Sequence, residues 1–223
     1  IDSLNAAARD MIGIAPAEGL DYSKRAYQLA TTNEFSQQPY HKGVAESLFN
    51  LASFHLEQGN PTLALSQAKE AYQLFLDLHE SISQVYTLRL IGAIYVTLNE
   101  YNKAMTSLLK ALEIARNTPD QRLMGEIFTF IGKTYLVSGE IEPAIDELKN
   151  AINILQSQKH EVPLSYAYNF LACAYKAIND QEVFRQYLQR SIEIAEDMGV
   201  VAMRLDYLYQ MGQLELREGK LEK

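Results

Sequence analysis

The sequence is poor in the residues that several classes of protein require. It contains one cysteine, Cys173, and no tryptophan among its 223 residues. A single thiol excludes an internal disulfide and a zinc site built from several cysteines. No apolar run reaches the roughly 18–20 residues of a membrane-spanning helix. The chain starts on a polar segment, 1–3, without a basic region, so no signal peptide is visible.

Basic side chains are in the minority. The chain has 20 Lys and Arg against 28 Asp and Glu, a formal net charge of −8. This balance lacks the electrostatic attraction that nucleic acids and anionic membrane surfaces require. We therefore expect neither a nucleic-acid nor a membrane partner. Because the sequence does not begin with methionine and stops within a repeat, we interpret it as a segment of a longer cytoplasmic protein.

Motifs for phosphate, dinucleotide or catalytic zinc binding are missing. The four histidines, His41, His55, His79 and His160, do not share a metal-ligand spacing. We interpret His55 as packed, and His79 and His160 as solvated residues of loops. The acidic residues, Glu126 among them, are interpreted as a solvated surface. We therefore predict no enzyme activity, no metal site and no cofactor.

The main feature of the sequence is an internal repeat of 40 residues. One column holds Gly or Asn, the two residues that most readily adopt the left-handed backbone conformation and so end helices. Its members are Gly59, Asn99, Gly139, Asn179 and Gly219. Three further columns consist mainly of small residues. They are Ala52, Gly92, Gly132, Ala172 and Gly212; then Ala64, Ala104, Ala144 and Phe184; then Ala71, Ala111, Ala151 and Ser191.

Apolar residues recur between these columns at intervals of three and four, which is typical of amphipathic helices. Each repeat is therefore predicted to be helix, tight turn, helix and loop. Pro61 and Pro143 fall in the first turns of second helices, and Pro119 and Pro163 in the connections. Small residues let the two helices approach closely, and a hairpin that cannot bury both faces stacks on the next. We predict an all-α, right-handed α-α superhelix (a solenoid) of about five hairpins and about eleven helices.

The predicted domain organisation is one continuous array over 1–223. A degenerate N-terminal repeat covers 1–41, with a short helix over 1–13, and is offset by 45 rather than 40 residues from the next copy. The additional five residues are assigned to the link over 31–42. Four repeats then cover 42–81, 82–121, 122–161 and 162–201, and 202–223 begins a further one.

The columns resemble the tetratricopeptide repeat, whose pattern is a large residue, Leu-Gly, Tyr, Ala, Leu or an aromatic residue, and Ala. The residues that follow it in order are Leu88, Ile91, Gly92, Tyr95, Ala104, Leu108 and Ala111. The period departs from the family's usual 34 residues. Gly43–Ala52 and Ala111–Ala115 also look like the N-terminal regions of bacterial signalling proteins. There, such an array precedes a diguanylate cyclase, a histidine kinase or a DNA-binding domain.

The resemblance implies a concave groove lined by fixed positions of the first helices. Transferred column by column, the partner-binding residues are Phe49, Asn50, Tyr86, Arg89, Phe130, Lys133, Tyr166, Asn169, Phe170 and Tyr209. Aromatic residues and arginine are frequent in binding hot spots. Packing within the core is an equally good interpretation of the three phenylalanines, whereas the polar tips of the tyrosines favour exposure.

The predicted function is non-catalytic binding of a protein or peptide segment, as the regulatory or sensor part of a larger bacterial signalling protein. Two alternatives remain open. The first is a homodimerisation scaffold for an attached output domain. The second is a helical-repeat enzyme with its site in the groove.

Overall fold

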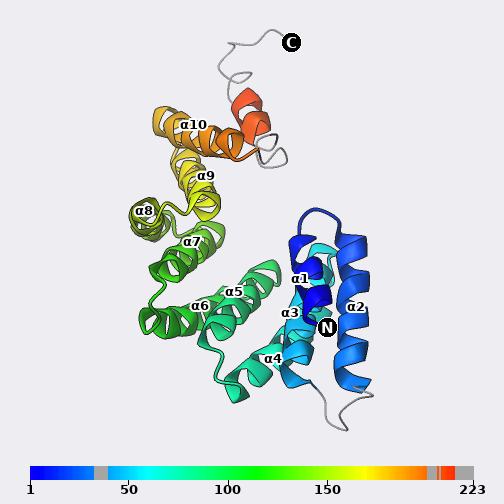
Figure 1. The fold of residues 1–223 in the computed structure, drawn as a ribbon. Helices are drawn as coiled ribbons and strands as arrows, with labels where there is room; N and C mark the ends of the chain where they lie inside the picture. The colour runs from blue at the N-terminus through cyan, green and yellow to red at the C-terminus, as the bar shows by residue number, and fades with distance from the viewer. Residues whose placement is uncertain (33–39, 200–204, 206, 214–223) are drawn as a thin grey trace. The chain divides into compact units, whose positions relative to one another are not determined.

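The computed structural model describes residues 1–32, 40–199, 205 and 207–213, and the regular structure of these residues is entirely α-helical (Figure 1). The first helices of the hairpins are α1 (Asp2–Asp10), α3 (His41–Glu57), α5 (Ser81–Thr97), α7 (Gln121–Ser138) and α9 (Glu161–Ala177). The second helices are α2 (Pro16–Thr32), α4 (Pro61–Asp77), α6 (Tyr101–Arg116), α8 (Ile141–Ser157) and α10 (Gln181–Asp197). Residues 207–213 are again helical. The predicted all-α class and helix order are confirmed.

The chain divides into two compact units, Ile1–Thr118 and Pro119–Lys223. In the first unit, helices α1 to α6 each pack on the next along the chain, and α3 also contacts α1 and α5. In the second unit α7, α8, α9 and α10 pack in the same successive way, and α7 contacts α9. Each unit is thus a stack of helical hairpins in the manner of a solenoid. The single continuous array and its repeat boundaries stay a prediction.

Left-handed residues end the first helices, as the Gly/Asn column predicts. The φ angles are 76° at Gly59, 59° at Asn99, 90° at Gly139 and 62° at Asn179. The next residue donates its N–H to a carbonyl five positions back, as in the 2.8 Å bond from the Glu100 amide to the Tyr95 oxygen. These bonds satisfy carbonyls that the helix leaves unpaired. Gly219 lies outside the described residues.

The small-residue columns mark the places where the helices of a hairpin cross. A Cβ atom on Gly132 would lie 2.5 Å from Leu148 Cγ and 3.2 Å from the Ala144 carbonyl oxygen. A Cβ atom on Gly92 would lie 2.9 Å from Leu108 Cδ2. A side chain at either position would force the facing leucine to shift, so the close approach of the second helix depends on glycine here.

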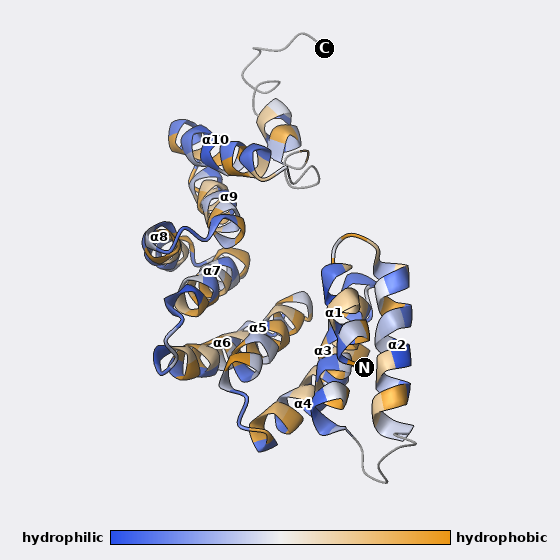
Figure 2. Ribbon diagram, in the orientation of Figure 1, coloured by the Kyte–Doolittle hydropathy of each residue, from blue (hydrophilic) through white to orange (hydrophobic). Residues whose placement is uncertain are grey.

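The hydrophobic face of each helix lies against its neighbours. Ala64, Ala104 and Ala144 are each 0% exposed, and Phe184 at the same column position is also fully buried. Figure 2 shows hydrophilic and hydrophobic residues together on the individual helices, as expected for amphipathic elements. Burial of such apolar faces is the main favourable contribution to folding.

Of the two prolines predicted to lie in connections, Pro119 does so and Pro163 does not. Pro163 is the third residue of α9 and not part of a connection. It is tolerated because amides in the first turn have no intrahelical acceptor. Pro119 occupies the position that His79 and Lys159 hold in other repeats, where φ is 56° and 52°. Proline fixes φ near −65°, so this left-handed turn cannot form, and the boundary between the two units falls there.

The N-terminal hairpin is joined to its neighbour by buried polar groups. Asn5 on α1 donates from Nδ2 to the Gly43 carbonyl (3.1 Å) and accepts from Ser47 Oγ (2.9 Å). Asn50 Nδ2 donates to the Asn5 carbonyl at 3.0 Å. Asn5, Ser47 and Asn50 are each 0% exposed. Directional bonds therefore fix α1 on α3.

Replacement of Gly132 by leucine should destabilise the C-terminal unit by about 3 kcal/mol, because the side chain would overlap Leu148 and backbone of α8. Thermal unfolding followed by circular dichroism at 222 nm measures the change. The matched control is Gly212→Ala, since a Cβ atom there meets no atom of the described residues within 4 Å. If Gly132→Leu unfolded at the wild-type temperature, the two helices would not cross at this residue.

Candidate functional site

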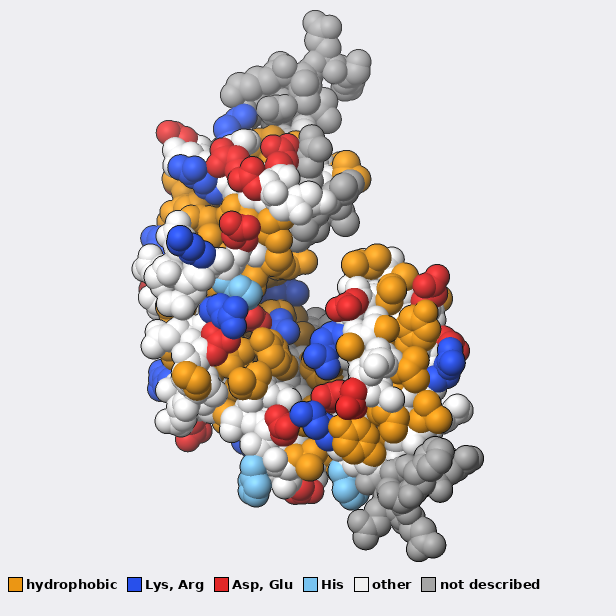
Figure 3. All heavy atoms as spheres, in the orientation of Figure 1, with side chains coloured by type: hydrophobic (Ala, Val, Ile, Leu, Met, Phe, Trp, Pro, Cys, Tyr) orange, Lys and Arg blue, Asp and Glu red, His pale blue; other side chains and the backbone are white. Residues whose placement is uncertain are grey.

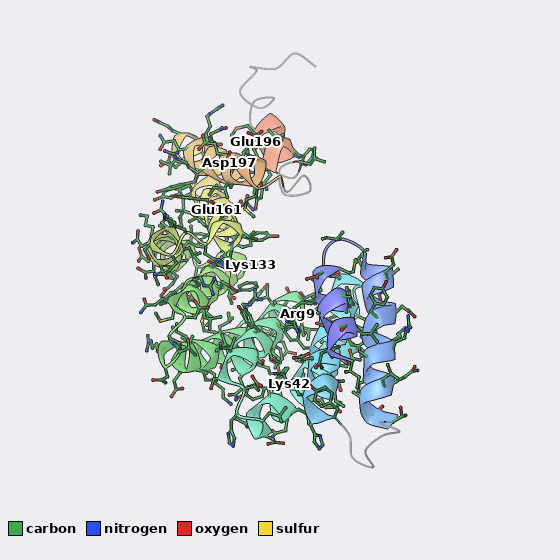
Figure 4. The ribbon with its side chains drawn as sticks, in the orientation of Figure 1. Arg9, Lys42, Lys133, Glu161, Glu196 and Asp197 are labelled. Carbon is green, nitrogen blue, oxygen red and sulfur yellow. The ribbon has the colours of Figure 1, made fainter. Side chains whose placement is uncertain are left out.

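Aromatic and basic residues of neighbouring first helices come together in the C-terminal unit. Phe130 and Lys133 lie on α7, and Tyr166 and Phe170 lie one turn apart on α9. The Lys133 Nζ atom is 5.3 Å from the centre of the Phe170 ring and 6.0 Å from that of Phe130. Tyr166 is 43% exposed. We call these four residues the α7–α9 surface; Figure 4 labels Lys133 on it.

Lys133 is electrostatically unlike the other lysines with shifted pKa values. Burial lowers the pKa of its ammonium below the usual value, and no charged group in the described structure opposes this effect. The pKa of Lys42, by contrast, is raised by a hydrogen bond and attraction to Glu80. The pKa of Lys103 is raised in the same way by Glu100. Lys133 thus keeps a half-buried positive charge beside two rings, whose faces attract cations.

Asn169 and Cys173 of α9 contact Gln210 and so hold residues 207–213 beside this helix. Asn169 is 8% exposed and its Oδ1 atom accepts a hydrogen bond from Gln210 Nε2 at 3.3 Å. Cys173, on the same helix, lies with its sulfur 3.8 Å from Gln210 Oε1. Tyr209 is 66% exposed. Asn169 therefore holds a neighbouring segment, and Tyr209 presents its side chain to solvent.

The predicted groove residues of the N-terminal unit divide into open and packed positions. On α5 the Arg89 guanidinium lies 5.5 Å from the centre of the Tyr86 ring, and both side chains are partly exposed. Phe49 is half-buried and packs on the core cluster that contains Leu48. Asn50 is fully buried beneath α1. The prediction that Asn50 faces a partner is thus wrong, because its amide is used within the fold.

Sequence reasoning missed that α1 covers this part of α3. The usable signal is the spacing, since Asn5 precedes Asn50 by the same 45 residues that separate the first two copies. Arg9 of α1 also reaches across to Glu46 of α3, with 3.9 Å between the Nη2 and Oε2 atoms. The pKa of Glu46 is nevertheless raised, because its burial outweighs the attraction of Arg9.

His160 and Glu126 are not the separate solvated residues that the sequence suggests. His160 Nε2 lies 3.2 Å from Glu126 Oε1, and the Glu126 side chain is only 12% exposed. His160 precedes α9 and Glu126 lies on α7, so the contact joins two first helices. His55 conforms to its prediction, since it is partly buried with Nδ1 2.7 Å from Gln67 Oε1.

The rest of the described surface is mixed in character. Figure 3 shows hydrophobic, acidic and basic side chains interspersed on the visible face. Within the described residues, no three His, Cys, Asp or Glu side chains are grouped so that they could hold a metal ion. None of the described helices combines the length and hydrophobicity that crossing a membrane requires.

The successive hairpins and their small-residue crossings define a helical-repeat protein, and comparison with known families specifies which kind. Family models described as tetratricopeptide repeat match residues 43–117 and 165–198. A model of anaphase-promoting complex subunit 5 matches residues 134–178. These matches identify tetratricopeptide repeats over residues 43–117 and 165–198 of the chain.

Relatives with known names are distant. The chain is 26% identical over 160 residues to response regulator aspartate phosphatase A of Bacillus subtilis (strain 168), covering 68% of this chain and 40% of that protein. It is 25% identical over 172 residues to tetratricopeptide repeat protein 29 of Macaca fascicularis, covering 70% of this chain and 35% of the relative. The chain therefore spans two fifths or less of the length of these relatives.

Solved structures share the fold at lower identity. The apo form of RapI superposes with a TM-score of 0.73 and 17% identity, over 95% of this chain and 76% of that one. A Rap protein complexed with competence and sporulation factor gives a TM-score of 0.74 and 19% identity, over 86% of this chain and 54% of that one. Helical solenoids are thus the architecture that this chain shares with them.

Replacement of Lys133 by methionine should stabilise the protein by about 0.5–1 kcal/mol at pH 7, because methionine packs against the rings without a buried charge. The pKa of Lys133 is lower in the folded state than the usual 10.5. At pH values between the folded-state pKa of Lys133 and 10.5, the unfolded chain binds more protons than the folded chain. The stability of the wild type therefore rises with pH in this range. The advantage of Lys133→Met should therefore be complete at neutral pH and shrink as the pH approaches 10.5. Urea unfolding of both proteins across this range measures it; an advantage that grew with pH would contradict the assignment.

Proposed function

We propose that the chain is a non-catalytic binding module that holds a segment of a protein or peptide partner against its first helices. The observation that carries this proposal is the α7–α9 surface. It combines an exposed tyrosine, two half-buried phenylalanine rings and a desolvated cation on adjacent helices. Tyrosine and other aromatic residues with a nearby cation are the usual anchors of protein interfaces.

A second binding element is proposed on α5 of the N-terminal unit. Tyr86 and Arg89 form a cation–π pair there, and both residues are partly exposed. Their pairing reduces the conformational freedom that a partner must remove on binding. Of the ten sequence-predicted groove residues, we retain Tyr86, Arg89, Phe130, Lys133, Tyr166, Phe170 and Tyr209 as contact candidates. Phe49, Asn50 and Asn169 are assigned to packing.

The proposed setting is regulation within a larger bacterial signalling protein. It is supported by the distant relative named response regulator aspartate phosphatase A and by the fold shared with a Rap protein complexed with competence and sporulation factor. We propose the cytoplasm as the compartment, since the sequence has one cysteine and offers no disulfide. We infer that the segment is not an enzyme. Burial raises the pKa values of Glu46 and Glu57, and these two carboxyl groups do not form the pair that acid–base catalysis would use.

Tyr166→Ala should weaken partner binding at least tenfold without lowering thermal stability, since the side chain is 43% exposed and its loss removes contact area with the partner. The probe is a peptide selected on the wild-type chain from a random dodecapeptide display library, with affinity measured by fluorescence anisotropy. Leu109→Ala is the control, because Leu109 is 52% exposed on a second helix. Equal affinities of wild type and Tyr166→Ala would remove the α7–α9 surface from the site.

Self-association is a second candidate function. Leu205 and Tyr209 are 61% and 66% exposed, and Leu208 is 39% exposed. With spacings of three and four, these residues can form one apolar stripe along a helix. If a second copy covers this stripe, Leu205→Glu with Leu208→Glu should convert a dimer into a monomer. Sedimentation velocity from about 1 to 100 μM measures this; a wild-type monomer throughout that range rejects the candidate.

A further inference from the structure

We propose that the α7–α9 surface selects partner segments that carry an aspartate or glutamate side chain next to an apolar residue, with Lys133 as the counter-ion. The inference rests on the proposed binding function and specifies its chemistry. It starts from an imbalance in the structure, since the ammonium of Lys133 lies beside two aromatic rings in desolvated surroundings and has no carboxylate partner among the described residues.

Other lysines of the chain have the ion pairs or hydrogen bonds that Lys133 lacks within the described residues. Lys42 Nζ lies 3.2 Å from Glu80 Oε1, and Lys103 forms an ion pair with Glu100. Lys149 on α8 contacts the Tyr175 ring at 5.9 Å and also forms a hydrogen bond to Tyr175 that raises its pKa. Within the described residues Lys133 contacts two aromatic rings and has no ion pair or hydrogen bond.

Burial of a cation without a partner costs free energy, which the two rings offset only in part. A partner carboxylate would recover much of it through a charge-assisted hydrogen bond in surroundings that are already partly dry. Because Lys133 is desolvated before the partner arrives, less water must be removed on binding. The arrangement therefore favours a carboxylate over a neutral acceptor.

The surroundings also define the form of the ligand. Phe130, Phe170 and the exposed ring of Tyr166 offer apolar contact area beside the ammonium, which suits an aliphatic or aromatic neighbour of the acidic residue. A single lysine matches the single charge of a carboxylate. A dianionic phosphate is disfavoured, since the chain carries a net charge of −8.

The test compares peptides selected on the wild type, Lys133→Met and Lys149→Met. Random dodecapeptides are fused through their C-termini to a phage coat protein, so that acidic side chains supply the peptide's carboxylates. Wild type and Lys149→Met should enrich peptides with Asp or Glu beside an apolar residue, and Lys133→Met should lose this enrichment. Lys149→Met is the matched control, because it removes a lysine that also lies over an aromatic ring but on a second helix.

A peptide selected on the wild type then provides the quantitative step. The acetylated and amidated peptide and its Glu→Gln or Asp→Asn version are titrated calorimetrically into each variant. The amide version should bind the wild type and Lys149→Met about tenfold more weakly, and both versions should bind Lys133→Met with the same affinity. Circular dichroism melting of the three proteins verifies that each is folded.

The outcomes separate this inference from the function on which it rests. Selected peptides without acidic residues, or acidic enrichment that persists in Lys133→Met, would overturn the role of Lys133 and leave peptide binding established. A wild-type chain that selects no peptide at all would reject both the inference and the proposed peptide-binding function.

Discussion

The fold depends on the distance at which the two helices of a hairpin cross. At Gly92 and Gly132 a single methyl group would collide with a leucine of the facing helix, so the sequence at these positions is set by space. The left-handed residues at Gly139 and Asn179 then reverse the chain over a short turn and deliver the second helix to that crossing. The crossings and turns fix where the next first helix can pack. The side chains that can contact a partner are those on the face of each first helix that does not pack against a neighbouring helix.

The partly buried charge of Lys133 costs stability. The buried positions of the first helices hold mainly apolar or small side chains, but Lys133 places an ammonium beside Phe130 and Phe170 with no acidic partner in the described structure. A residue of this kind weakens the free protein and is the usual mark of a site shaped by binding. Glu126 on the same helix differs from Lys133, because its carboxylate contacts His160 within the described structure.

Periodicity predicted the fold well because helix ends and crossings depend on local rules. Gly59 and Asn99 were placed in left-handed turns from their spacing alone, and Gly132 at a helix crossing from its column. The candidate site was less predictable, since exposure depends on which other helix covers a position. Asn50 occupies a groove column but is covered by α1, and the pairing of Glu126 with His160 spans 34 residues that no local pattern links.

The constant stride has a consequence for how such a chain can change length. A residue inserted within a helix would rotate every later position by about 100°, and would carry Gly132 or its equivalents away from the facing leucine. Insertions and deletions are therefore compatible with the fold only between helices. The one change of stride in this sequence, from 40 to 45 residues, agrees with that rule, since both α1–α2 and α3–α4 keep their hairpins on either side of it. Such a chain can therefore lengthen or shorten only in its connections or by whole hairpins.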